Sequence, residues 1–217
     1  MSVHDDETAC LRAAVGRMAA TEWEDRVFRA DVRCGGTSYD LMSDRAGDTR
    51  SESRFMPEPG PEDAPWVVQT VRLTARSTTD WKLEYLDGDL AGLEAVPDPE
   101  PPVRGEDPEG WWSNTTWTGM FDRRLAEMFR PAMLVSWLTE VRAERDEADG
   151  RSAYRLTARP RPWDACGCAY TGWAAIDMTR LSAAVDEETG FLLRAESYDG
   201  TRLRCRYEVT DLRLGGE

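Results

Sequence analysis

Hydrophobic and polar residues alternate with a period of two along most of the chain, a pattern that predicts β-strands with one buried and one solvated face. In the first run, Phe28, Ala30, Val32 and Cys34 alternate with charged residues. Further runs lie at residues 67–75, 81–85, 141–143, 154–158, 181–185, 191–195 and 203–209. Successive strands with short connections predict an antiparallel meander, and the polar run 141–143 is typical of an edge strand.

Turn sequences separate these predicted strands. The Asp-Gly pairs that favour tight turns are Asp87-Gly88, Asp149-Gly150 and Asp199-Gly200. Gly35-Gly36 predicts another turn, after which Tyr39 and Leu41 would return as the partner strand. In the last strand the alternation predicts a solvated face made of Arg202, Arg204, Arg206 and Glu208.

Helical periodicity occurs in two places. Residues 5–20 carry Leu11, Ala14, Val15 and Met18 on one face, which predicts an amphipathic first helix. Residues 111–138 contain a second helical segment that interrupts the strands. Its apolar face is predicted to consist of Phe121, Leu125, Met128 and Phe129, at spacings of four, seven and eight. Its polar face is predicted to consist of Asp122, Arg123, Glu127 and Arg130.

Pro131 ends or kinks this second helix, because proline has no N–H to donate and restricts the residue before it. A further short helix can begin on Pro131 as its first residue. Its apolar side is predicted to consist of Met133, Leu134, Trp137 and Leu138. Helices set among runs of strands predict an α+β protein with a helical plug rich in Trp, Met and Phe.

The overall charge restricts the possible partners. The 217 residues include 41 acidic and 27 basic side chains, for a net charge of −14. Nucleic acid and anionic membrane surfaces are therefore poor partners. No apolar run approaches the length of a membrane span. The N-terminal residues lack the basic segment followed by an apolar segment that is typical of a secretory leader, so a cytoplasmic location is expected.

Candidate catalytic and metal-binding chemistry is sparse. His4 is the single histidine, so a His-dependent triad or a His-bound metal is not expected. No glycine-rich phosphate loop occurs, and no cofactor is predicted. The acidic pairs Asp87/Asp89 and Glu187/Glu188 lie in predicted turns, where solvation explains them. An enzyme would need a buried, uncompensated carboxylate on an inward-facing strand position.

The five cysteines are scattered, which is typical of reduced thiols. Cys34 and Cys205 fall on the apolar sides of predicted strands, where a free cysteine behaves as a small hydrophobic residue. Cys166-Gly167-Cys168 lacks a second ligand pair for zinc and has one spacer residue rather than the two of a redox motif. It is interpreted as part of a loop.

Tryptophan is abundant, with nine residues in the chain. Aromatic and methionine side chains form adaptable linings for apolar ligands. Those predicted to contact such a ligand are Trp66, Trp81, Trp111, Trp112, Trp117, Phe121, Phe129, Met133 and Trp137; Trp163 and Trp173 add to the aromatic content. The alternative is that these residues simply fill the core. The acidic, proline-rich residues 96–110 are interpreted as a solvated loop, or alternatively as a flap before Trp111-Trp112.

Two motifs carry a resemblance to a known family. Residues 150–161, GRSAYRLTARPR, and residues 181–194, LSAAVDEETGFLLR, resemble successive strands of the LolA-like group of actinobacterial proteins. This group is related to the periplasmic lipoprotein carrier and to the N-terminal domain of a regulator that senses misplaced lipoproteins. The resemblance implies a strongly curved antiparallel sheet, an unclosed half-barrel, whose concave face is covered by helices and holds an apolar cavity. In the carrier, that cavity accepts acyl chains.

On this basis the chain is expected to be a single domain, residues 1–217. Its predicted parts are an N-terminal helix at 1–22, a first meander at 23–95, an acidic proline-rich loop at 96–112, a helical plug at 113–138 and a second meander at 139–217. Three functions remain open: binding of a lipid, acyl chain or hydrophobic metabolite, interaction with a protein partner, or catalysis on an apolar substrate. The first is preferred, with an apolar small molecule as the expected partner.

Overall fold

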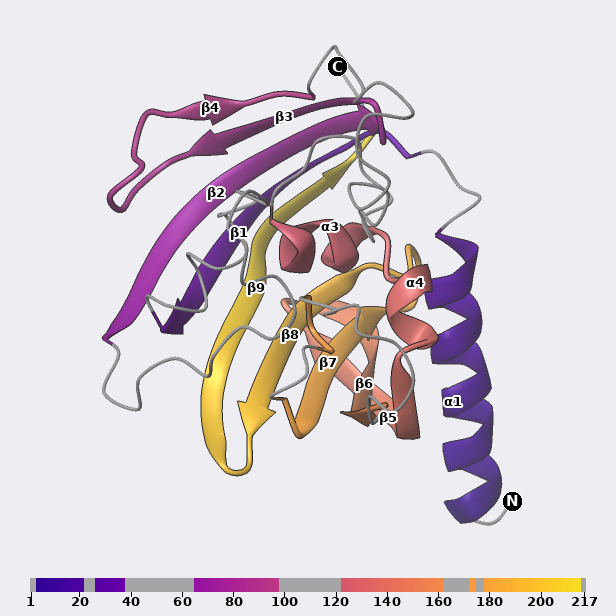
Figure 1. Cartoon of the computed structure of the whole chain (residues 1–217). Coiled ribbons are helices and arrows are strands. Elements are labelled where there is room, and N and C mark those ends of the chain that lie inside the picture. The colour runs from indigo at the N-terminus through magenta and orange to yellow at the C-terminus, as the bar shows by residue number, and fades with distance from the viewer. Residues whose placement is uncertain are drawn as a thin grey trace, which may run out of the picture.

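The structure is a computed structural model that describes residues 3–21, 26–37, 65–97, 122–161, 172–174 and 178–215. Its helices are α1 (Val3–Ala20), α3 (Arg123–Phe129) and α4 (Ala132–Val135). Its strands are β1 (Phe28–Thr37), β2 (Trp66–Ser77), β3 (Asp80–Tyr85), β4 (Glu94–Ala95), β5 (Leu138–Ala148), β6 (Arg151–Pro160), β7 (Arg180–Asp186), β8 (Leu192–Asp199) and β9 (Arg202–Leu214). Figure 1 shows their arrangement.

The strands form one nine-stranded sheet with the order β4-β3-β2-β1-β9-β8-β7-β6-β5. Every described pair of neighbours is antiparallel, and β4 and β5 lie at opposite ends, so the sheet is not closed. The pairing of β1 with β9 joins the first meander to the second. The predicted α+β class and the unclosed, curved antiparallel sheet are confirmed.

The helices cover the concave face, as predicted. Figure 1 shows the sheet bending around α3 and α4, with α1 standing at the β5 end. α1 contacts β5, β6, β7 and α4, and α3 contacts β8. The first helix extends over the predicted residues 5–20 and turns Cys10, Ala14 and Met18 into the core. No helix in the described ranges is both long and apolar enough to cross a membrane.

The alternating pattern separates two faces of the sheet. Phe28, Ala30, Val32 and Cys34 are buried on the concave face, as predicted. The outer face carries charged side chains that pair between neighbouring strands: Asp31 with Arg72, Glu144 with Arg155, and Glu196 with Arg206. These exposed or partly exposed pairs each contribute little to stability, but they keep the outer face solvated.

The prediction of a turn at Gly35-Gly36 is wrong. β1 runs through both glycines to Thr37, and they pair with β2 on one side and β9 on the other. Gly35 accommodates the ring of Trp66, since a Cβ at Gly35 would lie 3.0 Å from Cζ2 of that ring. Glycine therefore serves a close approach within a strand, a use that sequence cannot distinguish from a turn. Tyr39 and Leu41 lie outside the described residues.

Two further corrections concern strand ends and bulges. Leu138 was predicted on the apolar side of the second short helix but begins β5. Arg204 was predicted on the solvated face of β9 but is buried. The register of β8 with β9 shifts between Ser197 and Tyr198, which adds one residue to β9. This bulge allows Arg204 and its neighbour Cys205 both to be buried.

β5 is an edge strand, as predicted, and its edge is irregular. Glu140 has a φ of 50°, and the register of β5 with β6 shifts between Thr139 and Arg142. The Asp149-Gly150 and Asp199-Gly200 turns connect their predicted hairpins. At Asp87-Gly88 the chain makes a longer turn before β4 pairs with β3.

Gly190 is expected to tolerate no side chain. It has a φ of 77°, and a Cβ there would lie 2.7 Å from the carbonyl carbon of Arg17 at the end of α1. Gly190→Ala should therefore lower the free energy of unfolding by more than the roughly 1–2 kcal/mol that the left-handed backbone alone costs. Urea unfolding followed by circular dichroism measures the change.

The matched control is Gly200→Ala. Gly200 has a φ of 58° and no atom within 4 Å of the added Cβ, so only the backbone cost applies. Equal losses in the two variants would show that α1 does not rest on the turn between β7 and β8.

Candidate functional site

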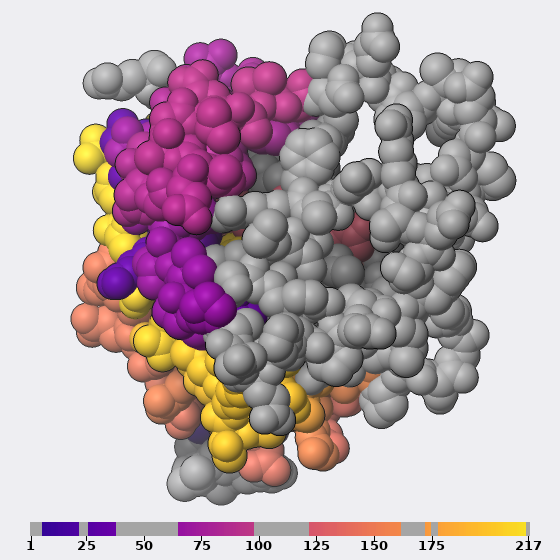
Figure 2. All heavy atoms as spheres, turned by 60° about the vertical axis from the view of Figure 1, so that its left-hand side comes forward, coloured from indigo at the N-terminus to yellow at the C-terminus, as the bar shows by residue number. Residues whose placement is uncertain are grey.

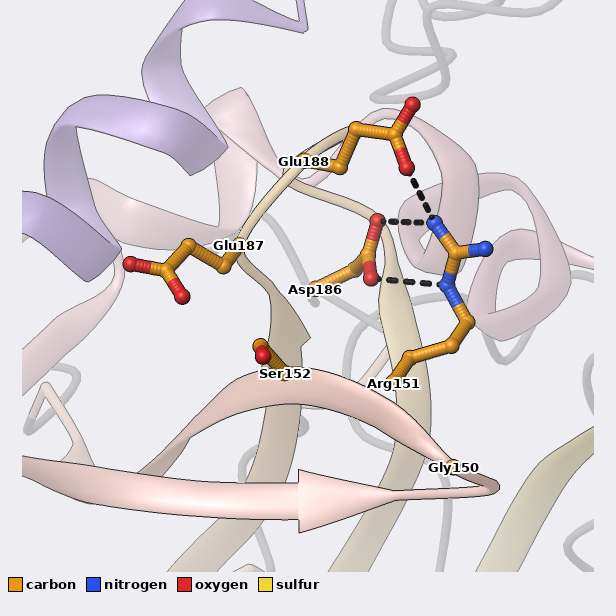
Figure 3. A pocket seen from close by; sticks show the side chains of 6 residues that line it. All are labelled: Gly150, Arg151, Ser152, Asp186, Glu187 and Glu188. Atoms are coloured by element: carbon orange, nitrogen blue, oxygen red, sulfur yellow. Dashed lines mark hydrogen bonds and ion pairs between the residues drawn. The ribbon is translucent and has the colours of Figure 1, made fainter.

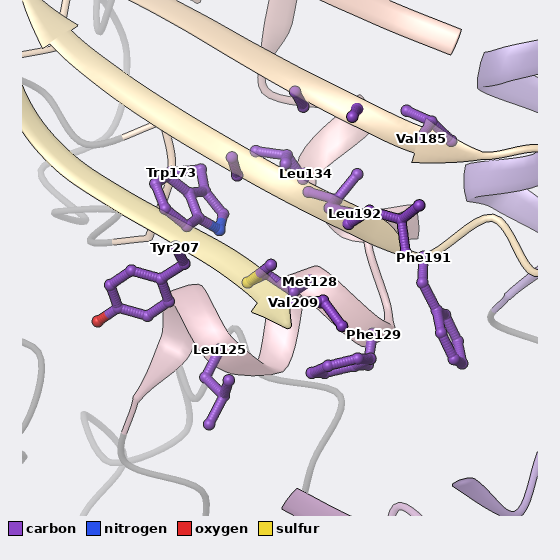
Figure 4. Packing of buried hydrophobic residues seen from close by; sticks show 14 of the residues in the cluster. Leu125, Met128, Phe129, Leu134, Trp173, Val185, Phe191, Leu192, Tyr207 and Val209 are labelled. Carbon is purple, nitrogen blue, oxygen red and sulfur yellow. The ribbon is translucent and has the colours of Figure 1, made fainter. Parts of the chain in front are cut away.

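The concave face is apolar and densely packed where α3 meets the sheet. Phe129 of α3 stacks on Phe28 of β1, with ring centroids 4.7 Å apart. Phe191, just before β8, lies 5.0 Å from Phe28 and 5.2 Å from Phe129. Leu125, Met128 and Leu134 are also fully buried here (Figure 4). Three rings from distant parts of the chain therefore fix α3 on the sheet.

Two buried carboxylates complete the attachment of α3. Asp122 caps the helix, with Oδ1 accepting from the Leu125 N–H at 2.9 Å. Its Oδ2 accepts from the Tyr207 hydroxyl on β9 at 3.0 Å. Glu127 accepts from the Trp173 N–H at 3.0 Å. The hydrogen bonds compensate the loss of water around these charges.

Trp173 is the aromatic centre of this attachment. Its side chain is fully buried, and its Nε1–H donates to the Arg124 carbonyl at 2.9 Å. Its ring meets that of Tyr207 edge-on, with centroids 5.2 Å apart, and Figure 4 shows the two rings beside β8 and β9. The Arg124 guanidinium carbon lies 6.0 Å from the ring centroid of Trp173.

Asp122 and Glu127 were predicted on the solvated face of the helix, and this prediction is wrong. Both are buried, with 6% and 4% of their surface exposed. The short helix is enclosed on more than one side, so its polar residues need protein partners rather than water. One signal for Asp122 was available, because aspartate immediately before a helix is a preferred N-cap residue. The partners Tyr207 and Trp173 depend on tertiary packing.

The nine predicted ligand contacts do not form one group. Trp81 and Phe129 are buried in the core, and Trp137 is half-buried against it. Trp66 and Met133 are exposed, at 44% and 41%. Trp111, Trp112, Trp117 and Phe121 lie outside the described residues, as do Trp163, Cys166 and Cys168.

Trp66 lies on the outer face of the sheet. Residues 69, 71, 73 and 75 of β2 face the core, so Trp66 and Val68 face outward. Leu86 follows β3 and is hydrogen-bonded through its N–H to the Thr70 carbonyl, which places it beside these residues. All three are more than a third exposed. Figure 2 shows β2 and β3 (purple to magenta) at the surface of the molecule.

A separate surface hollow of about 410 Å³ lies where the β5–β6 hairpin meets the β7–β8 turn. Its lining consists of Gly150, Arg151, Ser152, Asp186, Glu187 and Glu188. Arg151 donates to both carboxylate oxygens of Asp186, at 2.9 and 3.0 Å, and to Glu188 at 2.9 Å. Figure 3 shows Glu187 pointing away from Arg151.

Asp186 has a structural role in this hollow. Thr189 donates to its Oδ2 through both its N–H and its hydroxyl, at 2.9 and 2.6 Å. Burial alone would raise the pKa of Asp186, but hydrogen bonds from Arg151 and Thr189 outweigh burial and hold this pKa below its ordinary value of 3.8. The same pair raises the pKa of Arg151. The carboxylate is thus compensated and held ionised by its neighbours.

The described residues provide no cluster of three or more His, Cys, Asp or Glu side chains suited to a metal ion. Cys10, Cys34 and Cys205 are buried and take part in no disulfide bond within the described ranges. Asp122, Glu127 and Asp186, the buried carboxylates of the described chain, all accept hydrogen bonds that position the backbone or a neighbouring strand.

No protein-family model matches the sequence, and no curated protein matches it. Solved structures do match. The crystal structure of MucB matches with 16% sequence identity and a TM-score of 0.51. The aligned region covers 96% of this chain and 60% of the MucB chain. MucB in the Pseudomonas aeruginosa MucA/MucB complex has the same identity and TM-score, covering 95% of this chain and 57% of its own. This chain has a LolA-like fold.

The likeness to MucB establishes this fold alone, and the chain spans about 60% of the length of MucB. A LolA superfamily protein from Nitrosomonas europaea matches at 9% identity and a TM-score of 0.32, covering 96% of this chain and 94% of its own. In the LolA-like fold of this chain, the two motifs that predicted the resemblance meet in space. Arg151 comes from the first and Asp186 from the second, and they form one ion pair.

Arg151→Met should lower the free energy of unfolding at neutral pH by about 2–4 kcal/mol, because it leaves the buried Asp186 carboxylate without its cation. The folded-state pKa of Asp186 is lowered, so the pair stabilises the protein above the ordinary pKa of 3.8. This stabilisation is lost as the pH falls through the folded-state pKa. The difference between variant and wild type should therefore shrink below pH 3.8 in urea unfolding.

Arg159→Met is the control for that prediction. Arg159 and Glu140 form an ion pair at 3.3 Å in which both side chains are more than 60% exposed (63% and 66%). Its loss should change stability by less than about 1 kcal/mol at any pH. A pH-independent loss in Arg151→Met would contradict the assigned role of Asp186.

Tyr207→Phe should loosen α3, because it removes one of the hydrogen bonds to the buried Asp122 carboxylate. We expect a loss of about 1–2 kcal/mol in the free energy of unfolding and faster hydrogen exchange at Leu125. In the control Tyr198→Phe, the lost bond is to Glu196 on the outer face, and the exchange at Leu125 should not change. Unchanged exchange in Tyr207→Phe would refute the attachment.

Proposed function

We propose that the chain is a binding protein that holds an apolar molecule, such as a lipid, an acyl chain or a hydrophobic metabolite, between the concave face and its covering helices. The observation that carries the proposal is the arrangement of layers. Buried apolar side chains from β1, β2, β3, β6, β7, β8 and β9 share one face, and α1, α3 and α4 cover it. The region between two such layers is a typical place for a ligand.

The attachment of α3 supports this assignment. The helix has only seven residues and is held by a small number of specific contacts, chiefly the phenylalanine cluster and the bonds of Asp122 and Glu127. A short element attached in this way can separate from the sheet at a lower free-energy cost than a strand of the sheet. An apolar ligand can then take the place of its buried side chains.

The predicted ligand contacts enter the proposal with different roles. Trp81, Phe129 and Trp137 are proposed to line the ligand space from the sheet and the plug. Trp111, Trp112, Trp117 and Phe121 remain proposed contacts that belong to the sequence leading into α3. Met133 is exposed on α4, where it is available to a molecule entering from solvent.

A second candidate function is binding to a protein partner, and a specific observation favours it. The outer face carries Trp66, Val68 and Leu86 together, whereas the rest of the described outer face is dominated by charged pairs. Exposed tryptophan is typical of interaction surfaces. MucB, which shares the fold, has been solved in complex with MucA. Under this proposal, Trp66→Ala abolishes partner binding and leaves binding of the apolar molecule unchanged.

Catalysis has less support among the described residues. An enzyme acting on an apolar substrate would require a carboxylate that lacks compensation inside the ligand space. The three buried carboxylates described above accept structural hydrogen bonds instead.

Ligand binding can be tested directly. Native mass spectrometry of the freshly purified protein, followed by organic extraction, should reveal a retained apolar mass or binding of an added fatty acid. Ala195→Leu adds bulk on the concave face of β8 and should weaken fatty-acid binding by at least about tenfold, since overfilling a packed space is unfavourable. A ligand-free mass that stays unchanged with a panel of fatty acids and lipids would refute the proposal.

The matched control is Thr157→Leu, which adds a larger apolar side chain at an exposed outer-face position of β6. Its fatty-acid affinity should equal that of the wild type. Thermal unfolding of both variants shows whether the concave-face change acts through the ligand space or through loss of the fold.

A further inference from the structure

The hydroxyl of Ser197 is buried without a hydrogen-bond partner. Ser197 lies on the concave face of β8 with none of its surface exposed (0%). Its Oγ makes no hydrogen bond to any atom of the described chain. Buried hydroxyl groups are normally bonded, because burial removes their bonds to water. The buried carboxylates Asp122 and Glu127 at α3 each accept a hydrogen bond from a backbone N–H, whereas the Ser197 hydroxyl has none.

Ser197 lies between the fully buried Leu181 of β7 on one side and smaller side chains on the other. Ser197 pairs with Cys205 of β9, which pairs in turn with Gly36 of β1. One row further along the same face, Ala195 and Cys34 flank Tyr207. We call Cys34, Gly36, Ala195, Ser197 and Cys205 the small-residue end of the concave face. The side chains of these five residues are smaller than those of Phe28 and Trp81 at the opposite end of the face.

A buried positive charge lies next to Ser197 in the sheet. The bulge in β9 places Arg204 between Leu203, which pairs with Tyr198, and Cys205, which pairs with Ser197. Only 2% of the Arg204 side chain is exposed, and its Nη1 lies 3.9 Å from the half-exposed Asp199 carboxylate. Bulges often occur next to binding sites because they redirect a side chain. A cation at this position favours an electron-rich group nearby.

We propose that the small-residue end binds the oxygen-bearing head of an apolar chain, the carboxylate or carbonyl of a fatty-acyl ligand, through a hydrogen bond donated by the Ser197 hydroxyl. The inference rests on the proposed function and specifies the class of the ligand and its orientation on the concave face. The head lies at Ser197, under the influence of Arg204. The hydrocarbon tail runs along the face toward the apolar rows that contain Val32, Val71 and Leu73.

This orientation explains two features together. Under the proposal, the small side chains beside Ser197 lie against the head group. The hydroxyl then obtains its partner from the ligand rather than from the protein. A ligand with the same chain but no acceptor would gain the apolar contacts and nothing from Ser197.

The test compares two ligands in two serine variants. Lauric acid carries an acceptor head, whereas dodecyltrimethylammonium has a chain of the same length and no acceptor. Ser197→Ala should weaken lauric acid binding about 5- to 20-fold, the range for one hydrogen bond to an oxygen head. It should leave binding of dodecyltrimethylammonium within about twofold. Isothermal titration calorimetry below the aggregation concentrations of both ligands measures the affinities.

Ser182→Ala is the matched control, because Ser182 lies on the neighbouring strand β7 and pairs with Glu196 of the outer face. It should change neither affinity. Ser197→Ala should also unfold at the same or a higher urea concentration than the wild type, since the hydroxyl it removes has no partner. A lower midpoint would overturn the inference by showing that the hydroxyl stabilises the fold.

The remaining outcomes separate the two proposals. If the wild type binds both ligands and Ser197→Ala binds lauric acid equally well, the head-group inference fails while the proposed function stands. If the wild type binds neither ligand, nor any lipid in the native mass spectra, both fail.

Discussion

The pairing of β1 with β9 is the contact on which the rest of the structure depends. These strands lie near opposite ends of the chain, and they join β4-β3-β2-β1 to β9-β8-β7-β6-β5. Without this pairing, the chain would form two separate meanders, each with an exposed edge and half of an apolar face. The stack of Phe28 from β1 with Phe129 and Phe191 lies at this junction. Because the pairing closes a very long loop, it is expected to form late in folding.

The two motifs at residues 150–161 and 181–194 contain residues that fix the fold rather than residues that catalyse a reaction. Gly150 and Arg151 begin one strand, and Asp186, Thr189 and Gly190 form the turn after another. The ion pair, the threonine bonds and the positive φ of the glycine all fix the same corner. The end of α1 rests on this corner, so the turn also positions a covering helix. Sequence similarity in these segments therefore predicts the fold but does not predict the ligand.

Most of the fold could be predicted because it follows from local periodicity. Alternation placed Phe28, Ala30, Val32 and Cys34 on the buried face, and the structure agrees. Predictions failed where a long-range contact determines the role of a residue. The sequence Gly35-Gly36 predicts a turn, but in the structure these glycines lie within a strand and the Trp66 ring packs on Gly35. Alternation predicts that Arg204 is solvated, but a bulge in β9 changes its position. Asp122 and Glu127 appear solvated for the same reason, since their partners are distant in sequence. Ser197 carries no sequence signal, because an unpaired hydroxyl is defined by its surroundings alone.

An open sheet has two edge strands. The irregular edge of β5 protects one of them from pairing with a strand of another molecule. The left-handed backbone of Glu140 and the register shift beside it break the straight row of N–H and C=O groups that another strand would need. Charged residues along the same strand add repulsion and hydration. The half-barrel can thus stay open at this edge without offering a template on which further chains would add as strands and form fibres.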